Sequence, residues 1–115
     1  TARSESVASE RIVAMYAEAL ALTERMLEAA QASDWEGLVR VEQARDRLVE
    51  EIRLQDVDPA RSRPELRARK RELIESIMRR DTEVRALTED WMHELRDILA
   101  SANNSQRLSK TYDQS

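Results

Sequence analysis

The residues of this sequence that could do chemistry are few, and their spacing argues against an active site. His93 is the only histidine, Gly37 is the only glycine, and cysteine is absent. A serine or threonine nucleophile needs a base beside it, and a zinc site needs several imidazole or thiolate ligands. A phosphate-binding loop needs several glycines. The sequence therefore predicts no catalytic residue, no metal site and no cofactor.

Two cations that fall among apolar positions are the strongest argument for an enzyme. Arg45 and Lys70 lie within apolar stretches, where a small all-α enzyme of the chorismate mutase type would use cations to bind a dicarboxylate. Buried charges are rare unless they are paired, and long cationic side chains can reach solvent along apolar surface. We therefore favour local pairing, for example of Arg45 with Glu42, and keep the enzyme as an alternative.

The elements that position these residues are predicted to be helices. The 115 residues are 41% hydrophobic and 37% charged, with no Phe and two prolines. So few turn and aromatic residues do not suit a sheet, whereas apolar residues recurring at three and four are typical of amphipathic helices. Cap and turn residues divide the chain into helices over residues 5–31, 34–55 and 65–102 and a tail over residues 103–115.

The connections between these helices predict how they pack. Ser33 and Glu36 form a capping-box pattern at the start of the second helix, so the first loop is short and the first two helices are antiparallel. Pro59 and Pro64 bound a second short connection, so the third helix turns back as well. The predicted fold is a single all-α domain: an antiparallel three-helix bundle or hairpin with a long third helix and a short C-terminal tail or fourth helix.

Each predicted helix has an apolar arc wide enough to contact two neighbours. A closed three-helix bundle would use these arcs internally, whereas an open hairpin would leave part of the arc free to bind another helix. An amphipathic client segment would lie in a groove between helices, where methionines adapt to varied ligands, although methionines more often fill cores. Trp35 is expected to pack near Met26 or Leu27, and Trp91 against the first half of the first helix. The predicted client-binding groove comprises Met15, Leu22, Met26, Ile74, Met78 and Met92.

Two further segments are candidates for contact with partners. Arg67, Lys70 and Arg71 start the third helix and would suit an acidic partner surface. The formal charge of −4 and the lack of interleaved aromatic residues argue against nucleic acid, and no apolar run is long enough to span a membrane. Leu108 and Tyr112 lie four residues apart and would share one face of a short helix.

The middle of the chain resembles a known family. The segment LEAAQASDWEGLV over residues 27–39, followed by Glu42, Arg45 and Leu48, is similar to the flagellar export chaperone family FliT. The tail adds a Leu-x-x-x-Tyr segment that ends at Tyr112 and is similar to the C-terminal segment of that family. The helical plan and the lack of cysteine agree with the resemblance over nearly the whole chain.

The resemblance implies a cytoplasmic, non-enzymatic chaperone. Such proteins bind the C-terminal helical segment of the filament-cap protein FliD, prevent its premature assembly and deliver it to the type III export apparatus. Their implied partners there are the ATPase complex and the cytoplasmic domain of the gate FlhA, to which Leu108 and Tyr112 would dock. In some bacteria they also bind the regulator FlhDC and lower flagellar transcription. A self-associating structural hairpin is the other alternative, and both a monomer and a homodimer stay open.

Overall fold

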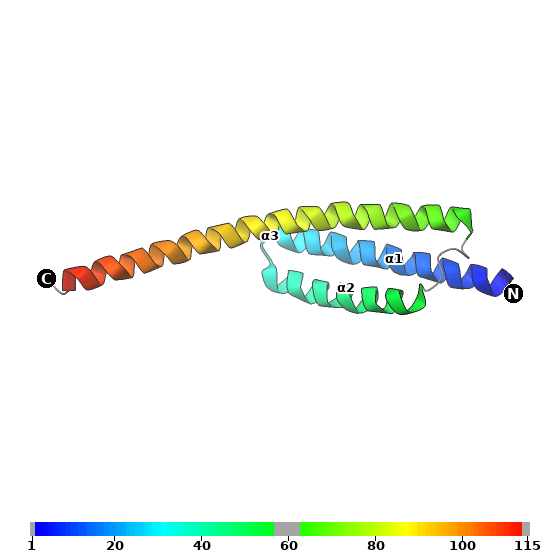
Figure 1. Cartoon of the computed structure of the whole chain (residues 1–115), viewed down its shortest axis with the longest axis horizontal. Coiled ribbons are helices and arrows are strands. Elements are labelled where there is room, and N and C mark those ends of the chain that lie inside the picture. The colour runs from blue at the N-terminus through cyan, green and yellow to red at the C-terminus, as the bar shows by residue number, and fades with distance from the viewer. Residues whose placement is uncertain (1, 57–62, 114–115) are drawn as a thin grey trace. The chain divides into compact units, whose positions relative to one another are not determined.

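A computed structural model describes residues 2–56 and 63–113, and the side chains of residues 7–56 and 63–104. Three helices follow one another: α1 over Ala2–Gln31, α2 over Trp35–Gln55 and α3 over Pro64–Asp113 (Figure 1). No strand occurs in these described ranges, so the all-α prediction is confirmed. The chain divides into two compact units, Thr1–Val84 and Arg85–Ser115. The expected single domain stays a prediction.

The helix bounds differ from the predicted ones mainly at the ends of the chain. α1 begins earlier than predicted, at Ala2, and α3 begins at Pro64, a position that suits proline. The break expected at Asn103 is wrong, because α3 continues to Asp113. No glycine or proline follows Asn103, and asparagine by itself lowers helix stability only slightly. Pro59 lies outside the described residues.

The corner between α1 and α2 is a Schellman turn that leads directly into a helix cap. Ser33 has a φ of 57°, and the N–H groups of Ser33 and Asp34 donate to the carbonyls of Ala30 and Ala29 at 3.1 and 2.8 Å. The carboxylate of Asp34 then accepts a hydrogen bond from the Gly37 N–H at 3.0 Å and caps α2. The predicted capping box at Ser33 is therefore wrong: Ser33 terminates α1, and Asp34 caps α2.

Replacing Ser33 with glycine is expected to raise the free energy of unfolding by about 0.5–1 kcal/mol. A residue with a Cβ is destabilised by about 1–2 kcal/mol in the left-handed region, and glycine removes this cost. Glycine also increases the conformational entropy of the unfolded chain, which offsets part of the gain in stability. Urea unfolding measures the change. Ala32→Gly is the matched control, because Ala32 is the neighbouring residue without a positive φ. A gain of the same size in the control would contradict this explanation.

Two apolar clusters form the core of the Thr1–Val84 unit, in which α1, α2 and the part of α3 up to Val84 lie side by side (Figure 1). Close backbone approach is concentrated between α1 and α2, and α3 makes few close backbone contacts with either helix. α3 is antiparallel to α2, as predicted, because its residues 70 and 81 pair with residues 56 and 45. The clusters comprise Met15, Ala19, Leu48 and Ile52 in one, and Met26, Leu38 and Val84 in the other.

The tryptophans fall in different units. Trp35 packs against the cluster that contains Met26, which confirms its predicted place in the core. Trp91 belongs to the second unit, and its predicted contact with the first helix stays a prediction. None of the described helices is long and apolar enough to cross a membrane.

Candidate binding groove

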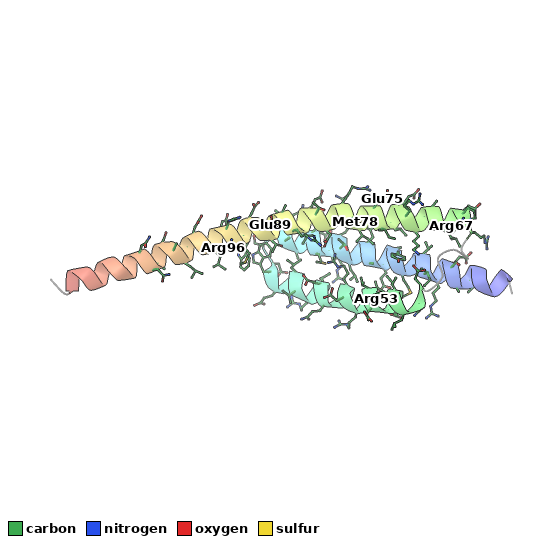
Figure 2. All side chains as sticks on the ribbon, viewed as in Figure 1. Arg53, Arg67, Glu75, Met78, Glu89 and Arg96 are labelled. Atoms are coloured by element: carbon green, nitrogen blue, oxygen red, sulfur yellow. The ribbon has the colours of Figure 1, made fainter. Side chains whose placement is uncertain are left out.

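An apolar groove of about 420 Å³ opens between α2 and α3 in the Thr1–Val84 unit. Ala19 of α1 contributes to its lining and is itself buried. Val49 of α2 and Met78 of α3 also line it, and they are 44% and 64% exposed, so the apolar walls reach solvent. Met78 is labelled on α3 in Figure 2. The remaining apolar lining residues are Ile52, Ile74 and Ile77.

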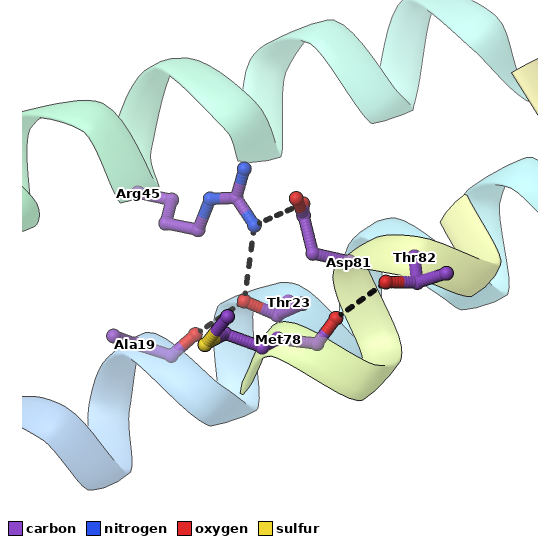
Figure 3. Close-up of polar contacts among 6 residues, drawn as sticks. All are labelled: Ala19, Thr23, Arg45, Met78, Asp81 and Thr82. Atoms are coloured by element: carbon purple, nitrogen blue, oxygen red, sulfur yellow. Dashed lines mark hydrogen bonds and ion pairs between the residues drawn. The ribbon is translucent and has the colours of Figure 1, made fainter. Parts of the chain in front are cut away.

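A polar layer of Thr23, Arg45 and Asp81, here called the Thr23 layer, connects all three helices (Figure 3). Arg45 Nη1 donates to Thr23 Oγ1 at 3.2 Å and to Asp81 Oδ1 at 2.8 Å. The Thr23 hydroxyl donates in turn to the Ala19 carbonyl at 2.8 Å, and Thr23 is fully buried. The prediction that Arg45 pairs locally with Glu42 is wrong, because the Arg45 guanidinium is paired across the groove with Asp81.

A second layer of Tyr16, Asp56 and Lys70, the Tyr16 layer, connects the same helices closer to the end of α2. The Lys70 ammonium pairs with the Asp56 carboxylate and lies 5.5 Å from the centroid of the Tyr16 ring. The Tyr16 hydroxyl donates to Asp56 Oδ2 at 3.1 Å. Burial raises the pKa of Tyr16 to about 12, and the hydrogen bond and negative charge of Asp56 act in the same direction.

The raised pKa of Tyr16 predicts a loss of stability at high pH. The stabilisation is complete below pH 10, where tyrosine keeps its proton in both states, and is lost as pH rises toward about 12. Allowing for partial solvent exposure, we expect the wild type to lose about 1–2 kcal/mol relative to Tyr16→Phe over this range. Urea unfolding of both proteins at several pH values measures the difference. Parallel stability curves would contradict this expectation.

The groove predicted from the sequence differs from the one in the structure. Met15 and Met26 are buried in the two core clusters, so they fill the core and do not line a surface groove. Leu22 packs against the cluster that contains Met15. Ile74 and Met78 do line a groove, but its opposite wall is α2 instead of α1.

The sequence prediction missed Val49 and Ile52, which complete the wall of the groove on α2. Both residues belong to the apolar arc that the sequence predicts for the second helix. The sequence does not show which edge of that arc faces the third helix. Met92 lies in the second unit and is partly exposed. Leu108 and Tyr112 fall within the last turns of α3, and their side chains lie outside the described residues.

The predicted basic contact surface is only partly available. Lys70 is paired with Asp56 inside the Tyr16 layer, whereas Arg67 and Arg71 are exposed on α3. All three cations line a small hollow with Ile74. Within the described side chains, no group of three or more histidine and carboxylate residues could hold a metal ion.

The fold and the groove define a small all-α protein with an open apolar groove between two of its helices. A family model described as "Flagellar protein FliT" matches residues 13–114. The chain therefore belongs to the FliT family of flagellar proteins, which gives it a role related to the flagellum.

The relatives that the chain matches carry the same description. It is 26% identical to "Flagellar protein FliT" of Yersinia pseudotuberculosis serotype O:3 (strain YPIII) over 105 residues, which covers 91% of this chain and 87% of the relative. It is 28% identical to "Flagellar protein FliT" of Citrobacter koseri over 92 residues, or 80% of this chain and 75% of the relative. No solved structure gives a significant match.

Proposed function

We propose that the protein is a cytoplasmic, non-enzymatic export chaperone that binds the C-terminal helical segment of the filament-cap protein FliD. The observation that supports this proposal is the apolar groove between α2 and α3, in a chain that belongs to the FliT family. The client segment would place its apolar face against Val49, Ile74 and Met78 and would be unable to assemble while bound.

The groove suits such a client because of the shape and flexibility of its walls. An amphipathic helix presents apolar side chains at i, i+3 or i+4, and i+7, and these would bury the exposed parts of Val49 and Met78. The unbranched Met78 side chain adapts to differently shaped client residues. Binding of this kind needs neither ATP nor a cofactor, and competition at the export gate would release the client.

The ion pairs of Arg45 and Lys70 favour a chaperone over an enzyme of the chorismate mutase type. That enzyme would need free cations inside the bundle to bind a dicarboxylate. Arg45 and Lys70, the two candidates for that role, are instead neutralised by Asp81 and Asp56. Asp46 and Arg53 also line the groove, and its exposed lining is mainly apolar.

The proposal extends to the partners of the chaperone in export. Delivery would involve the cytoplasmic domain of FlhA and the ATPase complex, with Leu108 and Tyr112 docking to the gate. Arg67 and Arg71, which are exposed, would contact an acidic partner surface. Binding to the FlhDC regulator would add a negative effect on flagellar transcription.

Replacing Met78 with glutamate is expected to weaken binding of a FliD C-terminal peptide by at least about tenfold. The substitution places a charge on the apolar wall, where a bound client would desolvate it. The free energy of unfolding should change by less than about 0.5 kcal/mol, because Met78 is 64% exposed. Isothermal titration calorimetry measures the affinity, and urea unfolding measures the stability.

Leu54→Glu is the matched control for this titration. Leu54 is also an exposed apolar residue of the first unit, at 71%, but it does not line the groove. The control should bind the FliD peptide like the wild type. Wild-type affinity in Met78→Glu, or an equal loss in both variants, would show that the client does not occupy this groove.

A further inference from the structure

α2 and α3 carry the same charge pattern with the same spacing. Arg45 of α2 precedes Asp56, the residue that caps the C-terminus of α2, by eleven residues, and Lys70 of α3 precedes Asp81 by eleven residues. Because the two helices are antiparallel, each cation meets the carboxylate of the other helix: Arg45 pairs with Asp81, and Lys70 pairs with Asp56. Both ion pairs therefore form at one and the same alignment of α3 with α2.

The four charged side chains are mostly shielded from solvent. Those of Arg45 and Asp81 are 17% and 18% exposed, and those of Lys70 and Asp56 are 17% and 13% exposed. Each pair is also tied to α1, through Thr23 in one layer and Tyr16 in the other. A misaligned α3 would leave all four charges shielded without their partners, which is costly.

The apolar contacts between the layers do not define an alignment in this way. Ile52 of α2 and Ile74 and Ile77 of α3 lie between the two layers, and aliphatic packing has no preferred direction. Since α3 makes few close backbone contacts with α2, few backbone clashes oppose sliding. A shift of α3 by one turn, about 5.4 Å, would bring Ile77 toward the place of Ile74, whereas it would break both ion pairs and displace the buried Leu73 and Val84.

We propose that the Thr23 layer and the Tyr16 layer together lock the register of α3 on the α1–α2 hairpin. The lock fixes where Ile74 and Met78 stand opposite Val49, and so determines the shape of the groove. Lys70 and Asp81 are then positioning residues for client binding, which act through the placement of Ile74 and Met78. The effect on the client rests on the proposed function, whereas the lock itself does not.

The register of α3 can be measured directly, because the chain has no cysteine. Spin labels on Leu54→Cys in α2 and Arg79→Cys in α3 report the alignment of the two helices, since both positions are exposed. Pulsed electron paramagnetic resonance should give one narrow distance distribution for the labelled protein. The uncharged variant replaces both ion pairs with apolar residues of similar size: Arg45→Met, Asp81→Leu, Asp56→Leu and Lys70→Met.

We expect the uncharged variant to stay folded, because apolar residues often replace buried ion pairs without loss of stability. Its distance distribution should nevertheless broaden or gain a second peak displaced by about one helical turn. The conservative variant, which has Asp81→Glu and Lys70→Arg and therefore keeps both ion pairs, should give a single narrow peak like the wild type. Arg80→Gln with Glu83→Gln removes an exposed ion pair of α3 and should leave the distribution unchanged.

The client arm uses the same variants with a FliD C-terminal peptide. The uncharged variant should bind at least about tenfold more weakly, and the conservative and control variants should bind like the wild type. A single narrow distribution in the uncharged variant would refute the lock whatever the peptide does. Failure of the wild type to bind the peptide would refute the proposed function. The distances between the spin labels would still show whether the two layers fix the register of α3. If the uncharged variant does not fold, the variant with only Arg45→Met and Asp81→Leu is judged by the same criteria.

Discussion

Replacing Met26 with alanine is expected to lower the free energy of unfolding by about 3 kcal/mol. Met26 is 1% exposed and packs with Leu38 and Val84, where α1, α2 and α3 meet. Truncation removes buried methylene and thioether contacts and leaves a cavity that close packing prevents from collapsing fully. Urea unfolding followed by circular dichroism measures the loss.

Met78→Ala is the matched control for this substitution. The same atoms are removed from a side chain that is 64% exposed, so the free energy of unfolding should change by less than about 1 kcal/mol. Under conditions in which both variants are folded, only Met78→Ala should weaken the proposed client binding. Equal stabilities of the two variants would show that the cluster around Met26 is not a packed core.

Replacing Asp81 with alanine is expected to lower the free energy of unfolding by about 2–3 kcal/mol. The substitution leaves the Arg45 guanidinium, which is 17% exposed, without its carboxylate partner. Removing one member of a fully buried pair costs about 3–5 kcal/mol, and the remaining solvent contact of this pair reduces the cost. Thermal or urea unfolding measures it.

Glu83→Ala provides the control, since Glu83 forms an exposed ion pair with Arg80 at 3.2 Å, also on α3. Its loss should change the free energy of unfolding by less than about 0.5 kcal/mol. Adding Arg45→Met to Asp81→Ala should recover part of the lost stability, because the unpaired charge is removed. No recovery in the double variant would argue against an unpaired cation as the cause.

The fold could be predicted from the sequence because its signals are local. Apolar residues at intervals of three and four, with few turn residues, indicate helices, and the short connections require antiparallel neighbours. The exact corner could not be predicted in the same way. Ser33 and Asp34 are both good cap residues, and the choice between them depends on the Schellman turn that puts Ser33 in the left-handed region.

The groove depends on contacts between residues that are distant in the sequence. The spacing of Arg45 and Glu42 suggested a pair within one helix, but the partner in the structure is Asp81 on another helix. In the same way, helical periodicity identified an apolar arc on α2 without showing that its Val49 edge faces α3. Periodicity determines which side of a helix is apolar, whereas the neighbour of each edge follows from tertiary packing.

The tightly packed α1–α2 hairpin has a consequence for the order of folding during synthesis. Its contacts join only residues of α1 and α2 with the residues that flank them, all of which precede α3 in the chain, and helical structures of low contact order fold in microseconds to milliseconds. The ribosome adds about 5–20 residues per second, so the hairpin has seconds to form before α3 is complete. The hydrogen bonds of Tyr16 with Asp56 and of Thr23 with Arg45 lie entirely within the hairpin. The groups that pair with Lys70 and Asp81 are therefore synthesised before α3 is complete, together with their hydrogen-bond partners on α1.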